Sequence, residues 1–443
     1  MRIPQTPPDR AAILARKAGQ ALSALSDAAL RPFLTDAQTG YWHWDKVRRV
    51  ARDRGWDPEV AWFGIKLARM SGARSTRLVG HGGVPITFTT PDIVQQETML
   101  IDQQLAGHIG LAGGAPLNHD TKERFIASSL MEEAIASSML EGAATTVRVA
   151  KEMLRQNRKP RTHGERMVHN NYLAIQFMRE RLDRPLSKAM LLELQSILTD
   201  STLEAPAQVG RLRRPDEQVV VRDSFGETVH TPPDAAELES RIESLCAFAN
   251  APDADAADGF VHPFVRASIL HFMIGFDHPF CDGNGRTARA VFYWSMLRRG
   301  YWLFEFLPIS RLIYKSPGQY GRAYLYTETD DFDATYFVVY HARIVSQARR
   351  DLAEYIKSKQ VELATARVRF STDPGLNDRQ HALLMHATEH PNSRYTIESH
   401  QNSHRVAYAT ARADLMALVD AGYLAMKKVG KRFVFTPSEK LSG

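Results

Sequence analysis

The stretch from 278 to 289 constrains the fold of this chain most, because it is a glycine-containing loop that joins two predicted helices. Apolar periodicity predicts one helix over residues 267–276 and a second over residues 287–297. The two glycines that flank Asn284 allow the backbone to turn its N–H groups toward one point. Since the loop leads into a helix N-terminus, the helix dipole adds to this positive potential. The sequence therefore predicts an anion-binding site where the second helix begins.

The charged side chains of this stretch suit chemistry on a phosphate group. Arg286 and Arg289 are three residues apart, so they share a helix face and can hold phosphate oxygens in bidentate fashion. Asp282 is a hard oxygen ligand and suits a Mg²⁺ ion that keeps most of its waters. His278 can accept a proton from an incoming hydroxyl, because the ordinary pKa of histidine is about 6.5. We therefore predict that His278 is a general base and that Asp282 is the metal ligand.

Residues 278–289 read HPFCDGNGRTAR, which resembles the Fic family signature HPFx(D/E)GNGRxxR at every fixed position. The resemblance implies transfer of a nucleoside monophosphate, usually AMP from ATP, onto a Ser, Thr or Tyr hydroxyl of a target protein. It implies that His278 deprotonates the hydroxyl, that Asp282 holds magnesium, and that Asn284 and the loop amides hold the α-phosphate. The residues expected to bind ATP around this loop are Phe280, Gly283, Asn284, Gly285, Arg286 and Arg289, with the two arginines on the β- and γ-phosphates.

Two positions of the stretch need separate comment. Cys281 is an alternative nucleophile beside His278, but it occupies the variable position of the signature, which favours an ordinary loop thiol. Ala288 stands where many family members carry glycine, and we expect little consequence because alanine is the better helix former. The resemblance leaves sibling reactions open: removal of AMP, or transfer of UMP, phosphocholine or phosphate.

A second motif precedes the signature. Residues 137–142 read SSMLEG and resemble the family's inhibitory pattern (S/T)xxxE(G/N), in which Ser137 and Glu141 are the fixed polar positions. The resemblance implies that Glu141 pairs with Arg289 and crowds the γ-phosphate, because a carboxylate in the arginine fork competes for the same donors. Apolar spacing predicts a helix that ends near residue 142. The helix dipole disfavours a carboxylate at this end unless a cation pairs with it. The alternatives are a solvated helix-end glutamate, or a glutamate that also supports AMP removal.

A lone hairpin is predicted over residues 218–230, with its turn at residues 223–226. An unpaired ribbon edge can register an extended peptide, and the resemblance implies that this flap holds the target over His278. An ordinary surface hairpin is the alternative. Three arginines precede the predicted hairpin: Arg211, Arg213 and Arg214. They either form a solvated surface run or attract ATP or an acidic target. The residues expected to position the target are Val219, Val220, Val221, Thr228 and Val229, and Tyr320 and Tyr324 are expected either to stack on adenine or to pack in the core.

The overall composition is that of an ordinary globular chain with no membrane span. The chain has 443 residues, is 44% hydrophobic and 24% charged, and carries a net charge of +6. Its two cysteines are too few for a disulfide scaffold or a cysteine-based zinc site, so we propose no structural metal. Because no secretion signal is evident at the start, we expect a cytoplasmic protein. Its oligomeric state, including a homo-oligomer, is open.

We predict a mainly α fold that consists of a Fic-type helical core with a β-hairpin flap and a C-terminal winged-helix domain. The predicted segments are an N-terminal accessory region (1–95), the catalytic core with the inhibitory helix (96–345), a connecting helix (346–372) and the winged helix (373–443).

The C-terminal segment raises a DNA-binding alternative. Helices are expected at 377–389, near 397 and at 406–421, followed by strands at 423–429 and 432–436. A winged helix of this kind places its third helix in the major groove of DNA. The segment's nine Lys or Arg against seven Asp or Glu favour DNA only weakly, so protein docking or dimerisation is an equal alternative. The candidate contacts are Arg405, Tyr408, Arg412, Lys427, Lys428, Lys431 and Arg432, and a DNA-binding regulator with the core as nucleotide sensor is the competing function.

Overall fold

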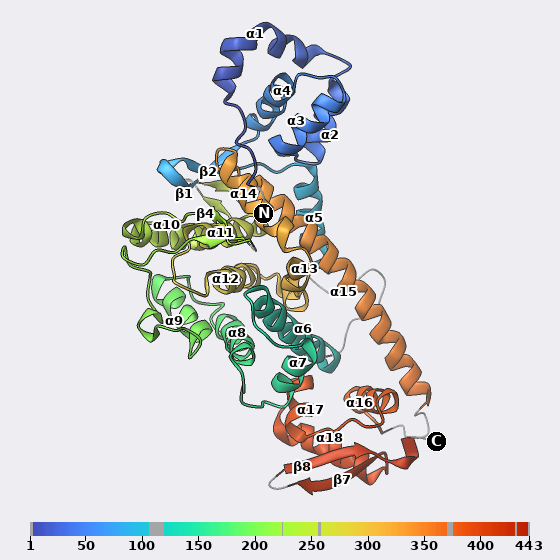
Figure 1. Cartoon of the computed structure of the whole chain (residues 1–443). Coiled ribbons are helices and arrows are strands. Elements are labelled where there is room, and N and C mark those ends of the chain that lie inside the picture. Colours follow the sequence, from blue (N-terminus) through green and yellow to red (C-terminus); the bar gives the residue numbers. More distant parts are fainter. Residues whose placement is uncertain are drawn as a thin grey trace. The chain divides into compact units, whose positions relative to one another are not determined.

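The computed structural model describes residues 3–105, 119–223, 225–255, 258–369, 375–429 and 432–441. These residues are mainly helical, and each sheet among them is a two-stranded antiparallel ribbon (Figure 1). The predicted fold class, mainly α, is therefore confirmed. The chain divides into two compact units, the first formed by residues 1–106, 176–302 and 315–346 and the second by residues 107–175, 303–314 and 347–443.

Four helices begin the first unit and enclose a tryptophan-rich core: α1 (Arg10–Ser26), α2 (Arg31–Thr39), α3 (Trp44–Asp53) and α4 (Pro58–Met70). Asp9 and Asp57 start α1 and α4 by accepting bonds from first-turn N–H groups, as good N-caps do. Trp62 is fully buried, and its ring meets that of Trp44 edge-on. The chain continues through the ribbon β1 (Arg74–Val79) and β2 (Pro85–Phe88) and through α5 (Asp92–Leu105).

Buried polar contacts tie these helices to the later part of the first unit. Lys66 Nζ lies 2.7 Å from an Asp330 carboxylate oxygen, and both side chains are buried. The Tyr41 hydroxyl donates to Asp333 at 2.5 Å. Separating such a buried pair would leave an uncompensated charge, which is costly. The contacts therefore hold the four N-terminal helices against the rest of the first unit.

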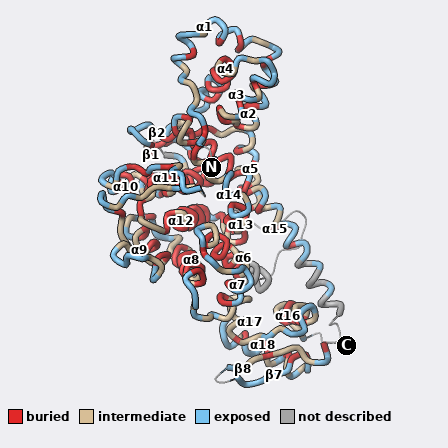
Figure 2. Tube along the Cα trace, viewed as in Figure 1, coloured by how far each residue is buried: buried red, intermediate tan, exposed pale blue. Residues whose placement is uncertain are grey.

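The centre of the first unit is the helix pair α11 (Pro263–Asp277) and α12 (Asn284–Arg298), in which nearly every residue is buried (Figure 2). Pro263 opens α11 at a position where its missing N–H costs nothing. Both helices extend beyond the predicted 267–276 and 287–297. The surrounding helices are α9 (Lys188–Thr199), α10 (Leu238–Asn250) and α14 (Pro317–Thr329), of which α9 packs on α12 and α10 packs on α11.

The second unit contains α6 (His119–Leu140) and α7 (Val147–Arg155), which pack together over a small core around Met131, Ile135 and Met153. Three helices contribute residues to both units: α8 (His163–Arg179), α13 (Ile309–Lys315) and α15 (Thr335–Arg369). The described part of the predicted connecting helix, residues 346–369, lies within α15, which begins earlier, at Thr335.

The C-terminal part of the second unit follows the predicted order of elements: α16 (Asp378–Glu389), α17 (Ile397–His404), α18 (Tyr408–Asp420), β7 (Leu424–Val429) and β8 (Arg432–Pro437). Side chains of Asn377 and Thr396 form capping boxes at the starts of α16 and α17. Tyr395 pairs with Phe435 on β8. The helices and the ribbon share one core, while the winged-helix assignment stays a prediction.

The remaining elements are short. They are β3 (Val221–Arg222), β4 (Thr228–His230), β5 (Ala254–Asp255), β6 (Gly259–Phe260) and the 3₁₀ turns η1 (His81–Gly83), η2 (Pro206–Gln208), η3 (Ala235–Glu237), η4 (Trp302–Phe306) and η5 (Glu439–Leu441). Among the described residues, no helix has the length and apolar character that a bilayer crossing requires.

Candidate active site

The loop between α11 and α12 depends on two left-handed residues. His278 follows the last residue of α11 with a φ of 45°, and Gly283 precedes the first residue of α12 with a φ of 89°. A side chain at position 283 would be strained at this φ, and its Cβ would approach Thr199 Cγ2 to 3.2 Å. The chain therefore leaves one helix and enters the next within six residues, as the glycines of the sequence predict.

Asn284 holds the loop together from the first position of α12. Its side-chain oxygen accepts the Phe280 N–H at 2.9 Å, and its side-chain nitrogen donates to the Phe280 carbonyl at 2.8 Å. Both residues are buried. The amide of Asn284 thus satisfies both main-chain polar groups of Phe280, which fixes the shape of the loop that precedes the helix N-terminus.

The imidazole of His278 is oriented by the helix that it follows. Its Nδ1 lies 3.0 Å from the carbonyl oxygen of Gly275. Because a carbonyl oxygen only accepts, Nδ1 carries the hydrogen, and Nε2 holds the lone pair of the neutral ring. The tautomer is thereby set for Nε2 to accept a proton.

Gly275 is itself required by close packing. A Cβ at this position would lie 2.2 Å from the hydroxyl oxygen of Tyr324. Tyr324 stacks on Phe272 at a centroid distance of 5.4 Å, and the hydroxyl of Tyr320 lies 2.8 Å from Nε2 of His271. Both tyrosines are half-buried within an aromatic cluster, so their predicted core packing is observed, whereas stacking on adenine stays a prediction.

Arg213 supports the loop from behind, a function that the sequence did not indicate. Its main-chain N–H donates to the Pro279 carbonyl at 2.9 Å, and its Nε donates to the His278 carbonyl at 2.8 Å. Its guanidinium also donates to the Pro233 carbonyl. Burial lowers the pKa of the Arg213 guanidinium. The expectation that this arginine run attracts ATP or an acidic target therefore does not describe Arg213, whose donors point at main-chain carbonyls.

Arg211 also has an internal partner, whereas Arg214 is exposed, as the solvated alternative expects. Arg211 makes a bidentate pair with Glu217, at 2.5 and 2.7 Å. The bonds from Arg211 hold the pKa of the Glu217 carboxyl well below its usual range. Arg214 donates its main-chain N–H to the same carboxylate at 2.7 Å.

Asp282 and Arg286 form a close ion pair, with Nη2 of Arg286 3.0 Å from Oδ2 of Asp282. The Arg286 side chain is fully buried and also donates to the Leu198 carbonyl at 2.9 Å, whereas the Asp282 side chain is 45% exposed. One accessible carboxylate fits a Mg²⁺ ion that is held mostly by waters and phosphate oxygens. Within the described ranges there is no group of three or more His, Cys, Asp or Glu side chains that would form an all-protein cage.

Gln195 on α9 is a further residue that the sequence did not indicate. Its side chain donates to the Asp282 carbonyl at 3.3 Å and accepts the Gly210 N–H at 2.6 Å. It is fully buried. Because it lies 87 residues before Asp282 in the chain, no local spacing could have revealed this contact.

A buried ion pair lies next to His278. Asp277 accepts from Nε of Arg241 at 2.7 Å, and burial raises the pKa of the Asp277 carboxyl to about 6. Arg241 also donates to the Val79 carbonyl at 2.6 Å. This pair anchors the C-terminal end of α11, from which the base extends.

The predicted flap is confirmed as a hairpin of β3 and β4, with Val221 opposite His230. It is shorter than expected, since Val219 and Val220 precede the strand. His230 ends β4, where its Nδ1 lies 2.8 Å from Glu328 and its Nε2 lies 2.8 Å from the Phe276 carbonyl. The flap is thus fastened to the last turn of α11.

The predicted inhibitory motif, residues 137–142, lies at the corner between α6 and α7. Ser137 and Ser138 are buried near the end of α6, and Ser138 donates to the Ala134 carbonyl at 2.8 Å. Glu141 follows the last residue of α6 and is exposed. The predicted position at a helix end is confirmed, and the pairing of Glu141 with Arg289, which belongs to the other unit, stays a prediction.

A family model and several curated proteins match this chain, and all of them are Fic proteins. Residues 185–296 match the sequence model of the Fic/DOC family. "Protein adenylyltransferase Fic" of Nematostella vectensis is 26% identical over 200 residues, which are 43% of this chain and 42% of the relative. "Protein adenylyltransferase fic-1" of Caenorhabditis elegans is 46% identical over 41 residues, which are 9% of this chain and 8% of the relative. The chain therefore matches less than half of the length of either relative.

A solved structure supports the same fold. A fragment of Fic-1 from C. elegans superposes with a TM-score of 0.51 at 17% identity, and the match covers 80% of this chain and 92% of that one. The signature loop lies inside the matched residues 185–296. Residues 185–296 of this chain therefore match a Fic domain of the Fic/DOC family.

Proposed function

We propose that this protein is an adenylyltransferase that moves AMP from ATP to a Ser, Thr or Tyr hydroxyl of a target protein. One observation carries the proposal: Nδ1 of His278 is committed to the Gly275 carbonyl, which leaves Nε2 as the basic nitrogen beside a helix N-terminus. Relatives named protein adenylyltransferases support the same reaction class.

In the proposed reaction, Nε2 of His278 accepts the hydroxyl proton while the hydroxyl oxygen attacks the α-phosphorus. A new oxygen–phosphorus bond forms, the bond from the α-phosphorus to the bridging oxygen breaks, and pyrophosphate leaves. The N–H groups at the start of α12 would stabilise the charge that develops on the α-phosphate oxygens. Phe280, Gly283 and Gly285 would shape this anion site.

The remaining roles follow from the charges. Asp282 would hold Mg²⁺, which supplies positive charge to the phosphate oxygens when bound. Because Arg286 donates to Asp282 in this structure, it would also orient that carboxylate. Arg289 would bind the outer phosphates, and flap residues Val221, Thr228 and Val229 would align the target. Val219 and Val220 would extend that surface.

We further propose that Glu141 restrains transfer by occupying Arg289, with Ser137 fixing the corner. The dipole at the end of α6 disfavours a carboxylate at this place, so a cationic partner would relieve it. Glu141→Gln should raise self-modification or target modification by roughly tenfold, the effect of losing one charge-assisted bond. Glu141→Asp keeps the charge and is the matched control.

Intact-mass measurement decides the reaction class. The Glu141→Gln protein is incubated with Mg²⁺ and, in separate reactions, with ATP, UTP, GTP or CTP. A mass gain of one AMP supports the proposal. A gain of another nucleotide or of phosphate assigns a sibling reaction, and loss of AMP from a pre-modified substrate assigns the reverse reaction.

A further inference from the structure

The second unit contains an open groove with a volume of about 1170 Å³. Residues of α7 form one wall, and residues of the C-terminal helices and ribbon form the other. Helix α17 packs against α7, which fixes the two walls together. The cationic side chains that line the groove are Arg148, Lys151, Arg155, Arg394 and Arg432.

Three of these arginines form no ion pair with another described residue, although the Glu132 carboxylate attracts Arg155 from a longer distance. Among the described residues, Arg148, Arg155 and Arg394 form no ion pair, whereas Lys151 lies 3.2 Å from Glu132. Arg155 is half-buried on the inner side of α7, and burial lowers the pKa of its guanidinium. Removing a guanidinium partly from water costs free energy unless an anion pairs with it. The groove therefore has unused capacity for negative charge.

The rest of the lining is mixed rather than purely cationic. Val429 is 55% exposed, and Val434 and Pro391 provide further apolar surface. Two carboxylates, Glu152 and Glu389, also line the groove. A phosphate backbone would meet these carboxylates at regular intervals, whereas a peptide can place acidic side chains at the arginines and apolar side chains at the valines.

We propose that this groove is a docking site for an acidic peptide segment of a partner protein. The acidic side chains would pair with Arg148, Arg155 and Arg394, and intervening apolar residues would contact Val429 and Val434. Nothing in this assignment depends on the transfer reaction.

The predicted DNA contacts lie mainly on α18 and the β7–β8 ribbon, and one of them, Arg432, also lines the groove. The exposed residues of α18 include Tyr408, Ala409, Arg412 and Ala413, of which one is charged. Lys427 and Lys428 are exposed on β7, while Lys431 lies outside the described residues. Among these exposed α18 residues Arg412 is the single cation, whereas five cationic side chains line the groove.

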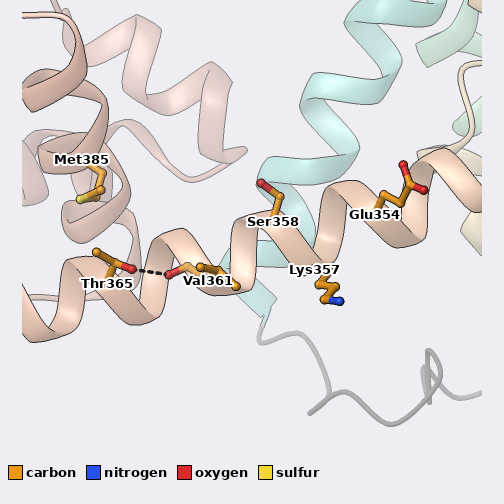
Figure 3. Close-up of a pocket in the computed structure, with 6 residues that line it drawn as sticks. All are labelled: Glu354, Lys357, Ser358, Val361, Thr365 and Met385. Atoms are coloured by element: carbon orange, nitrogen blue, oxygen red, sulfur yellow. Dashed lines mark hydrogen bonds between the residues drawn. The ribbon is translucent and has the colours of Figure 1, made fainter.

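A second hollow in this unit lacks such selectivity. It has a volume of about 440 Å³ and is lined by Glu354, Lys357, Ser358, Val361, Thr365 and Met385 (Figure 3). The Thr365 hydroxyl donates to the Val361 carbonyl at 2.9 Å. One cation and one carboxylate give this hollow no preference for a charged ligand.

The test uses the full chain and a fluorescein-labelled peptide with four repeats of Glu-Glu-Val, measured by fluorescence anisotropy. Charge reversal in Arg148→Glu/Arg394→Glu should weaken binding by at least roughly tenfold. The matched control is Arg49→Glu/Arg52→Glu, which reverses two exposed arginines of α3 and should bind as the unchanged protein does. Arg148→Gln/Arg394→Gln should weaken binding less, and it replaces the first variant if the melting temperature of that variant falls.

Three results would overturn the assignment. Equal weakening in the α3 control would make the binding non-specific. Tighter, groove-dependent binding of a labelled twelve-residue oligothymidylate would assign single-stranded nucleic acid instead. Absence of peptide binding at low salt, where exposed charges attract most strongly, would remove the docking site.

Discussion

The signature loop and the groove use the same residue type in opposite ways. At the loop, Arg213 and Arg286 are buried and donate to main-chain carbonyls or to Asp282. In the groove, Arg148 and Arg394 are exposed and form no ion pair with a described residue. An arginine with satisfied donors positions other groups, and an arginine without an anionic partner is available to bind. The number of arginines in a segment therefore says less about function than the partners of each one.

The largest expected effect is on the transfer rate, which should depend on the loop and not on the groove. His278→Asn should lower the transfer rate by roughly 100-fold to 10,000-fold, the usual contribution of a general base. Asparagine tolerates the left-handed backbone of this position, and its side-chain nitrogen can still donate to the Gly275 carbonyl. Single-turnover rates with labelled ATP provide the measurement.

Two controls accompany this variant. Its melting temperature and its ATP affinity should match those of the unchanged protein, and its binding of the Glu-Glu-Val peptide should be unaltered. Turnover close to the normal rate would exclude His278 as the base.

The next effect tests whether the loop is held by its own side chains. Asn284→Ala should lower the free energy of unfolding by about 2–6 kcal/mol, because two buried main-chain groups of Phe280 lose their partner at about 1–3 kcal/mol each. The variant should lower kcat more than it raises KM, since the loop amides would lose their alignment. Asn284→Asp keeps the acceptor for the Phe280 N–H and should cost less in urea unfolding. An equal loss in both variants would contradict this account.

The smallest effect compares a paired arginine with an unpaired one in the second unit. Arg158 makes two bonds with Glu165, at 2.7 and 3.1 Å. Arg158→Gln should lower the free energy of unfolding at pH 7 by about 1.5–3 kcal/mol, the usual value for a hydrogen bond between charged groups. The control, Arg148→Gln, should change it by less than about 0.5 kcal/mol.

The pH dependence of this loss has a definite sign. The bonds from Arg158 lower the pKa of the Glu165 carboxyl to about 2 from its ordinary value of 4.5. Because the folded pKa lies below the unfolded one, the pair stabilises the fold above pH 4.5 and loses this effect as the pH falls toward 2. The difference between the Arg158→Gln protein and the unchanged protein should therefore shrink over that range in thermal melts. A difference that is constant with pH would show that the ion pair is not its origin.

Much of the local structure could be predicted from the chain alone. Gly283 indicated a turn, and apolar periodicity placed the helices on either side of it and the order of the C-terminal helices and strands. These features depend on interactions within a few residues, which spacing and residue type reveal directly. The shorter flap was not foreseen, because valine favours strands but pairing requires a partner opposite each residue.

Long-range contacts decided what the local pattern left open. Gln195 reaches Asp282 across 87 positions, and Arg213 reaches His278 across 65. The groove exists because α17 packs on α7, which lies about 250 residues earlier in the chain. Sequence by itself therefore determined the helices, the turn and the reactive residue types, since each follows from neighbours along the chain. Only the tertiary structure decided which arginines bond to main-chain carbonyls of distant segments, because Arg213 and Arg286 reach partners that folding brings close.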